Sequence, residues 1–207
     1  MKKIIYLFVF CTFSVLGQDR KMNLHLFFET GINTQFQLNE VLKENNLKEI
    51  KPNVVGLNMG YTFCPNKIGY YSDLSYQRTV EGSIYQSLGF SVGMVLKQKL
   101  FKAASINYIP YIKLRSHNVN VINSQDNTVT SDQLATASGG DLTLYGSTFG
   151  FGGKVIYTYN NFWHFGFSFD SSVKPIHWEM KNQHISDLPK DDFTNFSVLL
   201  GFNLTRK

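Results

Sequence analysis

The sequence lacks the features that would place it in several common classes of protein. Beyond residue 17 it has no apolar run of about 18 residues, so we expect no transmembrane helix. Of its 2 cysteines only Cys64 lies after that point, which excludes an internal disulfide and the paired-cysteine spacings of zinc sites. Only 17% of residues are charged, and the formal net charge of +5 is too weak and dispersed to indicate a nucleic-acid partner.

The first residues are typical of an export signal. Lys2 and Lys3 precede an apolar stretch, which ends in small residues at Gly17. We therefore predict a signal peptide over residues 1–17 and a mature chain of one domain over residues 18–207. Export without a helical anchor leaves the periplasm, the outer membrane or the medium as destinations.

Apolar and polar residues alternate in eight separate segments. In the first segment Leu24, Leu26 and Phe28 share one face, and the residues between them share the other. A period of two is typical of a β-strand with two different faces. The eight predicted strands are Leu24–Gln37, Val54–Phe63, Ile68–Val80, Ser83–Leu96, Ala103–Arg115, Leu142–Tyr159, Phe162–Val173 and Thr194–Leu204. Pro110 removes one ladder donor from the fifth strand, so we expect a bulge or bend there.

The connections between these segments alternate between short and long. Those after the second, fourth and sixth strands are short, and Asn160-Asn161 suits a two-residue hairpin. Those after the first, fifth and seventh are long, at residues 38–53, 116–141 and 174–193, whereas Glu81-Gly82 is tight. Bacterial barrels carry short turns in the periplasm and long loops outside, and this asymmetry matches them.

The polar face of the strands contains many small residues. It holds ten glycines, among them Gly56, Gly89 and Gly150, together with several serines. A surface in water would favour Thr, Lys and Glu and avoid glycine, whereas a narrow barrel interior needs small side chains. The apolar face carries the bulky aliphatic and aromatic residues and would then face lipid. The sequence therefore predicts an all-β fold, an eight-stranded antiparallel up-and-down transmembrane β-barrel in the bacterial outer membrane.

Three segments carry a resemblance to a known family. They are the signal ending in Gly17-Gln18, the first-loop segment Leu38–Leu47 and the closing strand Phe196–Leu204. With them, nearly the whole mature chain resembles the PorT-like or OmpX-like outer membrane protein beta-barrel domain family. The resemblance implies a barrel in the outer membrane. Such barrels commonly end on an aromatic residue, whereas here Phe202 is followed by five more residues.

Charged residues on the inward face predict a lumenal charge cluster. Counting from the periplasmic strand ends places Glu29, Asp73 and Lys154 at similar heights, so we expect Lys154 to pair with both carboxylates. Lys113 and Arg115 lie higher. The predicted cluster comprises Glu29, Asp73, Lys113, Arg115, Lys154 and Asp170.

No catalytic, cofactor or metal site is predicted. His164, Ser168 and Asp170 share the inward face of the seventh predicted strand, but four residues along a strand span about 13 Å, too far for a nucleophile and its base. His177 and His184 lie in the last loop without a third ligand nearby.

Two long loops contain recognisable local patterns. The first can form a short helix, with Asn39 as its N-cap and Asn45-Asn46 as its end, or an ordinary structured loop. In the last loop Pro175, Ile176, Trp178 and Met180 are apolar enough to contact a partner or the outer leaflet.

These patterns favour a non-enzymatic outer-membrane barrel. Its expected partners are outer-membrane lipid and, through the long loops, an extracellular ligand or another envelope protein; a role in envelope integrity is the other form of this hypothesis. Two alternatives stay open, a lipid-modifying barrel enzyme and a secreted lipocalin-like carrier. A pore is the least favoured function, because side chains fill the lumen of eight strands.

Overall fold

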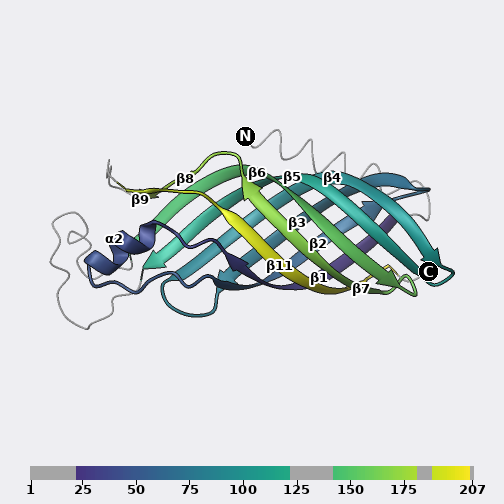
Figure 1. Cartoon of the computed structure of the whole chain (residues 1–207), viewed down its shortest axis with the longest axis horizontal. Coiled ribbons are helices and arrows are strands. Elements are labelled where there is room, and N and C mark those ends of the chain that lie inside the picture. The colour runs from purple at the N-terminus through teal and green to yellow at the C-terminus, as the bar shows by residue number, and fades with distance from the viewer. Residues whose placement is uncertain (1–21, 122–141, 181–187, 206–207) are drawn as a thin grey trace.

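The described residues, 22–121, 142–180 and 188–205, form a closed antiparallel barrel in the computed structural model (Figure 1). Eight strands pair in the order β5-β4-β3-β2-β1-β11-β7-β6, and β5 pairs with β6 to close the ring. This confirms the predicted up-and-down barrel. No helix among these residues is long and apolar enough to cross a membrane. The predicted signal peptide lies outside the described residues and stays a prediction.

The helix and strands follow the chain in a simple order. They are β1 (Met22–Asn33), α2 (Leu38–Glu44), β2 (Asn53–Phe63), β3 (Ile68–Thr79), β4 (Ile84–Phe101), β5 (Ala104–Val121), β6 (Leu142–Tyr159), β7 (Trp163–Ser172), β8 (Ile176–His177), β9 (Glu179–Met180), β10 (Lys190–Asp191) and β11 (Thr194–Asn203).

The alternation along each strand separates a buried face from an exposed one. On β1, Phe27 is 1% exposed and its neighbour Phe28 is 53% exposed. Bulky apolar side chains such as Leu74 and Phe167 cover the outside, and the glycine-rich face lines the inside. So large an apolar outer surface needs an apolar solvent. The exposed band therefore favours a barrel in lipid and argues against the lipocalin-like carrier, whose apolar face would line the lumen.

Three strands end four or more residues away from the predicted position. The first ends at Asn33 instead of Gln37, because the chain turns there towards α2. The fourth continues past Leu96 to Phe101, and the fifth continues past Arg115 to Val121. Residues 116–120, predicted as the start of a loop, pair on both sides with β4 and β6, and Val121 pairs with β6. The barrel wall is therefore taller here than the sequence pattern indicated.

The irregularity expected at Pro110 is present as a gap in one ladder and not as a bulge. The pairs Gly93–Tyr111 and Leu96–Tyr108 keep one register across the proline, and the register shift of this ladder lies between Lys99 and Phe101. Pro110 is paired with β6 and lies in a gap of the β4–β5 ladder. The missing donor therefore interrupts the ladder locally without inserting a residue.

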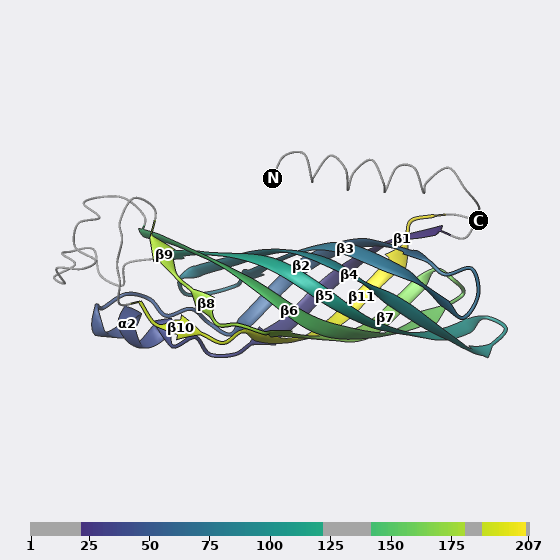
Figure 2. The same cartoon turned by 90° about the horizontal axis from the view of Figure 1, so that it is seen from above.

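The two ends of the barrel are built differently, as Figure 2 shows. At one end, here called the loop end, lie α2 and strands β8, β9 and β10. At the other, the turn end, lie the short connections after β2, β4 and β6 and the first and last residues of the barrel. Asn160 and Asn161 have φ of 51° and 54°, and the backbone N–H of Phe162 donates to the carbonyl of Tyr159, so the predicted turn forms at these two residues. Because Tyr159 pairs with Trp163, however, three residues and not two connect the strands. Phe162, which the period of two places on the same predicted inward face as His164, is instead 43% exposed.

Candidate functional site

The lumen is the candidate site, and its loop end is closed by an apolar core. Leu38 and Leu42 of α2 pack with Trp178 and Phe193 of the last loop and with side chains from the upper ends of the strands. The full set, called here the apolar cap, is Phe36, Leu38, Leu42, Leu47, Ile50, Val54, Tyr85, Val119, Val121, Leu144, Ile176, Trp178 and Phe193. Ile176 and Trp178 are thus buried in the cap, which corrects the expectation that they lie free to contact a partner.

A glycine on β6 makes room for the last loop in this cap. A Cβ at Gly146 would lie 2.4 Å from Cγ2 of Ile176 and 3.1 Å from the carbonyl oxygen of His177. Both distances are shorter than ordinary contacts, so a larger residue at this position would require Ile176 and the backbone of His177 to shift. The absence of a side chain at Gly146 therefore allows β8 to lie close to β6.

Asp191 ties the last loop to the first. The backbone N–H of Gln37 donates to its Oδ1, and the backbone N–H of Leu38 and the indole Nε1–H of Trp178 donate to its Oδ2, at 3.4 Å and 2.5 Å. Gln37 is the N-cap of α2 and makes no side-chain cap, so a carboxylate 154 residues away takes that role. Burial raises the pKa of Asp191 above its ordinary value, and the donated hydrogen bonds oppose that rise.

Asn39, predicted as the N-cap of the helix, has a different role. It lies within α2, where its side chain accepts from the backbone N–H of Ile50 at 2.8 Å and donates to the carbonyl of the same residue at 3.0 Å. The helix does end at Asn45, as predicted. Asn39 therefore fastens the helix to the returning chain instead of starting it.

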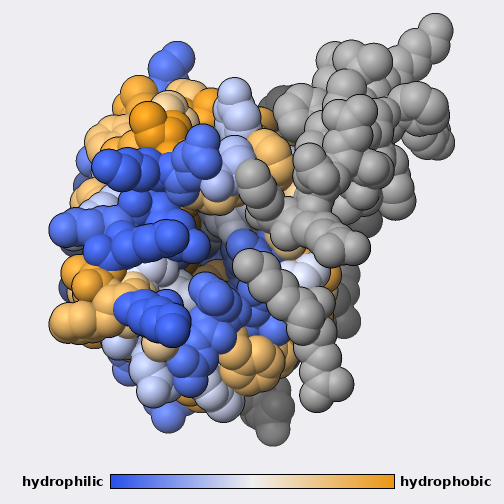
Figure 3. Space-filling view, turned by 90° about the vertical axis from the view of Figure 1, so that its right-hand side faces the viewer, coloured by the Kyte–Doolittle hydropathy of each residue, from blue (hydrophilic) through white to orange (hydrophobic). Residues whose placement is uncertain are grey.

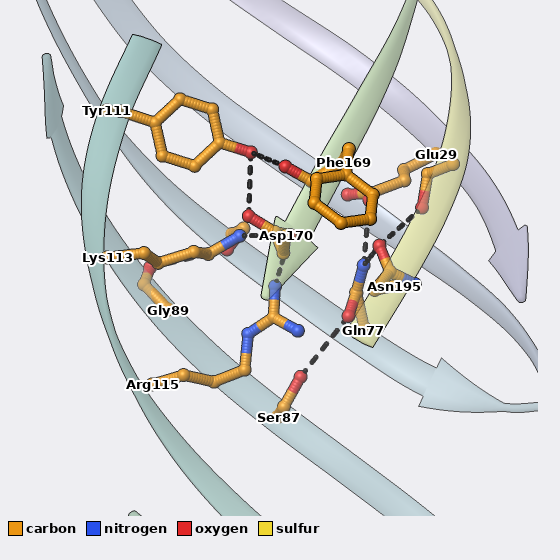
Figure 4. Close-up of polar contacts among 12 residues, drawn as sticks. Glu29, Gln77, Ser87, Gly89, Tyr111, Lys113, Arg115, Phe169, Asp170 and Asn195 are labelled. Atoms are coloured by element: carbon orange, nitrogen blue, oxygen red, sulfur yellow. Dashed lines mark hydrogen bonds and ion pairs between the residues drawn. The ribbon is translucent and has the colours of Figure 1, made fainter. Parts of the chain in front are cut away.

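Below the cap, Asp170 of β7 gathers three residues of β5 (Figure 4). Its Oδ2 lies 3.2 Å from Nζ of Lys113 and 2.8 Å from Nη2 of Arg115, and its Oδ1 accepts from the hydroxyl of Tyr111 at 2.6 Å. Arg115 also lies over the ring of Phe193, 4.4 Å from its centroid. All these charges are buried, so each depends on its partner.

The other half of the predicted cluster is centred on Asp73 of β3. Lys154 of β6 donates to Oδ2 of Asp73 and, at 2.7 Å, to the hydroxyl of Tyr71. Tyr71 in turn donates to the same carboxylate at 2.5 Å. The pair spans the lumen, because β3 and β6 are not neighbours in the ring.

Glu29 does not join the pair of Lys154 and Asp73. Its Oε1 accepts from Nε2 of Gln77 at 2.7 Å, and it forms no ion pair within the described chain. Strands in a barrel are tilted and staggered, so equal counts from their ends are not equal heights. The six residues of the predicted cluster thus lie in the same lumen as two separate ion-paired groups and a hydrogen-bonded glutamate.

A layer of aromatic and aliphatic side chains lies between these ion pairs and the turn end. It consists of Phe27, Tyr71, Val95, Ile109, Tyr111, Ile156 and Leu199. Beyond this layer the lumen opens into a hollow of about 40 Å³, lined by Lys97, Thr158, His164 and other mostly polar residues. Figure 3 looks onto this end and shows hydrophilic side chains around a hollow centre.

The catalytic groups weighed in the sequence lie apart in the structure. His164 pairs with Thr158, and Asp170 with the cations of β5, while Ser168 stands opposite Lys154 in the ladder. No three His, Cys, Asp or Glu side chains converge on a metal-sized site within the described chain. His184 lies outside the described residues.

The comparisons with known proteins support the fold. No family model matches the chain, and no curated protein matches its sequence. Among solved structures, Neisserial surface protein A superposes with a TM-score of 0.60 at 6% identity, covering 89% of this chain and 96% of that one. A major outer membrane protein from Thermus thermophilus gives 0.54 at 7% identity, covering 89% and 100%. Ail, the attachment invasion locus protein of Yersinia pestis, gives 0.51 at 10%, covering 88% and 95%. The fold is that of outer-membrane β-barrels.

Proposed function

We propose that this chain is a non-enzymatic outer-membrane barrel that holds a rigid platform of loops at the cell surface. The observation that carries this proposal is the apolar cap, in which two long loops and the strand ends form a common buried core. A passage for solutes would not need such a core, whereas a surface for binding would gain from being held in one shape.

The orientation follows from the asymmetry of the two ends. In bacterial barrels the short turns face the periplasm and the long loops face outward. The turn end would then face the periplasm, and α2 with the last loop would face the medium. The OmpX-like resemblance fits the outer-membrane neighbours, and membership of the PorT-like group is part of this proposal.

The interior argues against a pore and gives little support to an enzyme. Three acids and three bases of the predicted cluster balance one another, and apolar layers lie on both sides of them. His164 and Asp170 contact other partners, and Ser168 stands opposite Lys154 in the ladder. The outer surface of the loops is then the expected functional region, where an extracellular ligand or another envelope protein would bind. The other form of the proposal is a contribution to envelope integrity.

Surface labelling and conductance test this proposal together. An epitope tag near Asn127, in the segment outside the described residues, should be reached by antibody on intact cells. A matched tag in the turn at residues 64–67 should be reached only after the outer membrane is permeabilised. The opposite labelling pattern would reject the orientation, and stable unitary conductance of the folded protein in a planar bilayer would reject the closed platform.

A further inference from the structure

The hollow at the turn end has a polar wall that the proposed platform does not use. His25 of β1 and His164 of β7 both line it, with their ring centroids 5.8 Å apart. Both side chains are more than nine-tenths buried, and Nε2 of each has no hydrogen-bond partner within the described chain. Buried polar atoms are rarely left unpaired, so these two nitrogens indicate a missing partner.

A chain of hydrogen bonds leads from Asn107 to the ring of His164 and bears on which ring nitrogen carries the proton. Nδ2 of Asn107 donates to Oγ1 of Thr158 at 3.1 Å, and that oxygen lies 3.0 Å from Nδ1 of His164. The amide takes one of the two acceptor positions of the hydroxyl and leaves the hydroxyl O–H free to donate to Nδ1 of the ring. In that arrangement the neutral imidazole carries its own proton on Nε2. His164 offers a free N–H donor to the hollow.

The charge around the hollow has one sign. Lys97 lines it, and three more lysines, Lys67, Lys99 and Lys102, lie at the same end of the barrel. No Asp or Glu occurs in the parts of the structure that form this end, namely residues 22–24, 63–68, 95–105, 158–163 and 202–205. A group that entered here would meet N–H donors and positive charge, so its own atoms should be acceptors with negative charge.

The volume limits the size of that group. The hollow of about 40 Å³ holds roughly three water-sized groups, at 10–15 Å³ for each. A carboxylate has three heavy atoms, whereas a phosphate has five. We propose that the turn end is a binding pocket for a carboxylate at the end of a peptide or small acid, held by His164, His25 and Lys97.

The pocket is separate from the apolar cap, and its binding of a carboxylate does not rest on the proposed orientation. With that orientation the ligand would come from the periplasm. The test uses the whole folded protein in detergent, so its result does not depend on which way the barrel is inserted. Isotope-labelled histidine rings are followed by NMR while N-acetyl-alanine is added. Its amide, chloride and inorganic phosphate are added to parallel samples.

The expected result is a saturable shift of both ring signals with N-acetyl-alanine and none with its amide. Lys97→Gln and His164→Phe should each weaken binding roughly tenfold, the loss expected for one charge-assisted hydrogen bond. Lys99→Gln, on the same strand but outside the hollow, and His177→Gln, at the loop end, should each change it less than about twofold. Heat-modifiable migration on a gel confirms that each variant is folded.

Three results would overturn the proposal. One is the absence of a saturable shift up to about 0.1 M N-acetyl-alanine. At that ionic strength charges more than roughly 10 Å apart are screened, so a shift would have to come from close contacts. The second is an equal response to the amide or to chloride. The third, tighter binding of phosphate than of N-acetyl-alanine, would reject the carboxylate as the ligand.

Discussion

The loop end and the turn end of the lumen are filled by opposite kinds of side chain. The loop end holds an apolar cap, drawn from segments as far apart in sequence as Phe36 and Phe193. The turn end holds asparagine, threonine, histidine and lysine around a hollow. The loops are long enough to supply a core of their own, whereas two-residue and four-residue turns have no side chains to spare for one. In this barrel the end with the long loops is therefore the end that an apolar core seals.

Buried ion pairs lie between the two ends of the lumen. They lie in the barrel interior, between the apolar cap and the layer of Phe27, Tyr71 and Tyr111. Because every member of the pairs is buried, loss of one leaves an opposite charge without water or partner. Substitutions in the lumen should consequently cost more than substitutions at either end.

The largest loss of stability is expected for Asp170→Leu. This change leaves Lys113 and Arg115 facing each other without their shared carboxylate, at a cost of about 4 kcal/mol in the free energy of unfolding. Urea unfolding of the folded protein in detergent measures it. The control replaces all three charges together, by Asp170→Leu, Lys113→Met and Arg115→Met, and should regain most of the loss. A loss below about 1 kcal/mol for the single change would show that water reaches these charges.

A smaller loss is expected for Lys154→Met. Asp73 is then left without its cation, but the hydroxyl of Tyr71 still donates to it, so the cost should be about 3 kcal/mol. Adding Asp73→Leu should restore stability. Lys97→Met, which removes a lysine from the hollow, is the matched control and should cost less than about 0.5 kcal/mol. If Lys154→Met costs no more than this control, the lumen is wetter than the packing indicates.

Much of the wall could be predicted from sequence because lipid and lumen impose a period of two. The hairpin at Asn160-Asn161 follows from local chemistry in the same way. The extension of β5 to Val121 could not be predicted, because residues 116–121 are held by pairing with β4 and β6 rather than by their own pattern. Likewise, the register across Pro110 depends on the ladders on either side of it.

The contents of the lumen were harder to predict than the wall. The pattern placed the right residues inside, but counting from strand ends ignored stagger and put Glu29 beside Lys154 instead of Gln77. The cap could not be predicted from local sequence patterns. The acceptor at the start of α2 is Asp191, and Trp178 is buried by residues distant in sequence. For the two histidines of the hollow the sequence gave one indication only, which is their inward position in the alternating pattern of polar and apolar residues.

The apolar cap should open as a unit separate from the barrel. Leu42→Ala removes a buried side chain of α2, and because loop segments can partly collapse, the cost should be about 2 kcal/mol, at the low end of such changes. Lys43→Ala on the same helix should cost less than about 0.5 kcal/mol. Fluorescence of Trp178 in a Trp163→Phe background reports the cap, and heat-modifiable migration reports the barrel. A coincident shift of both transitions would mean that the two regions unfold together.

The smallest effect concerns the pH dependence of the cap through Asp191. Burial raises the pKa of its carboxyl in the folded protein above the value of 3.8 that the unfolded chain has. The folded cap then binds the proton more tightly than the unfolded chain does, so its stability should rise as pH falls through the folded pKa and level off below 3.8.

This sign is opposite to that of carboxylates held by ion pairs, which lose stability in acid. Urea unfolding of the cap, followed by Trp178 fluorescence between neutral pH and about pH 4, measures it. Asp191→Asn keeps one acceptor oxygen and cannot titrate, so it should cost about 1 kcal/mol at neutral pH and remove the dependence. If the cap instead weakens steadily in acid, and equally in the Asn variant, its pH response comes from other groups and Asp191 is better solvated than its contacts with α2 and Trp178 indicate.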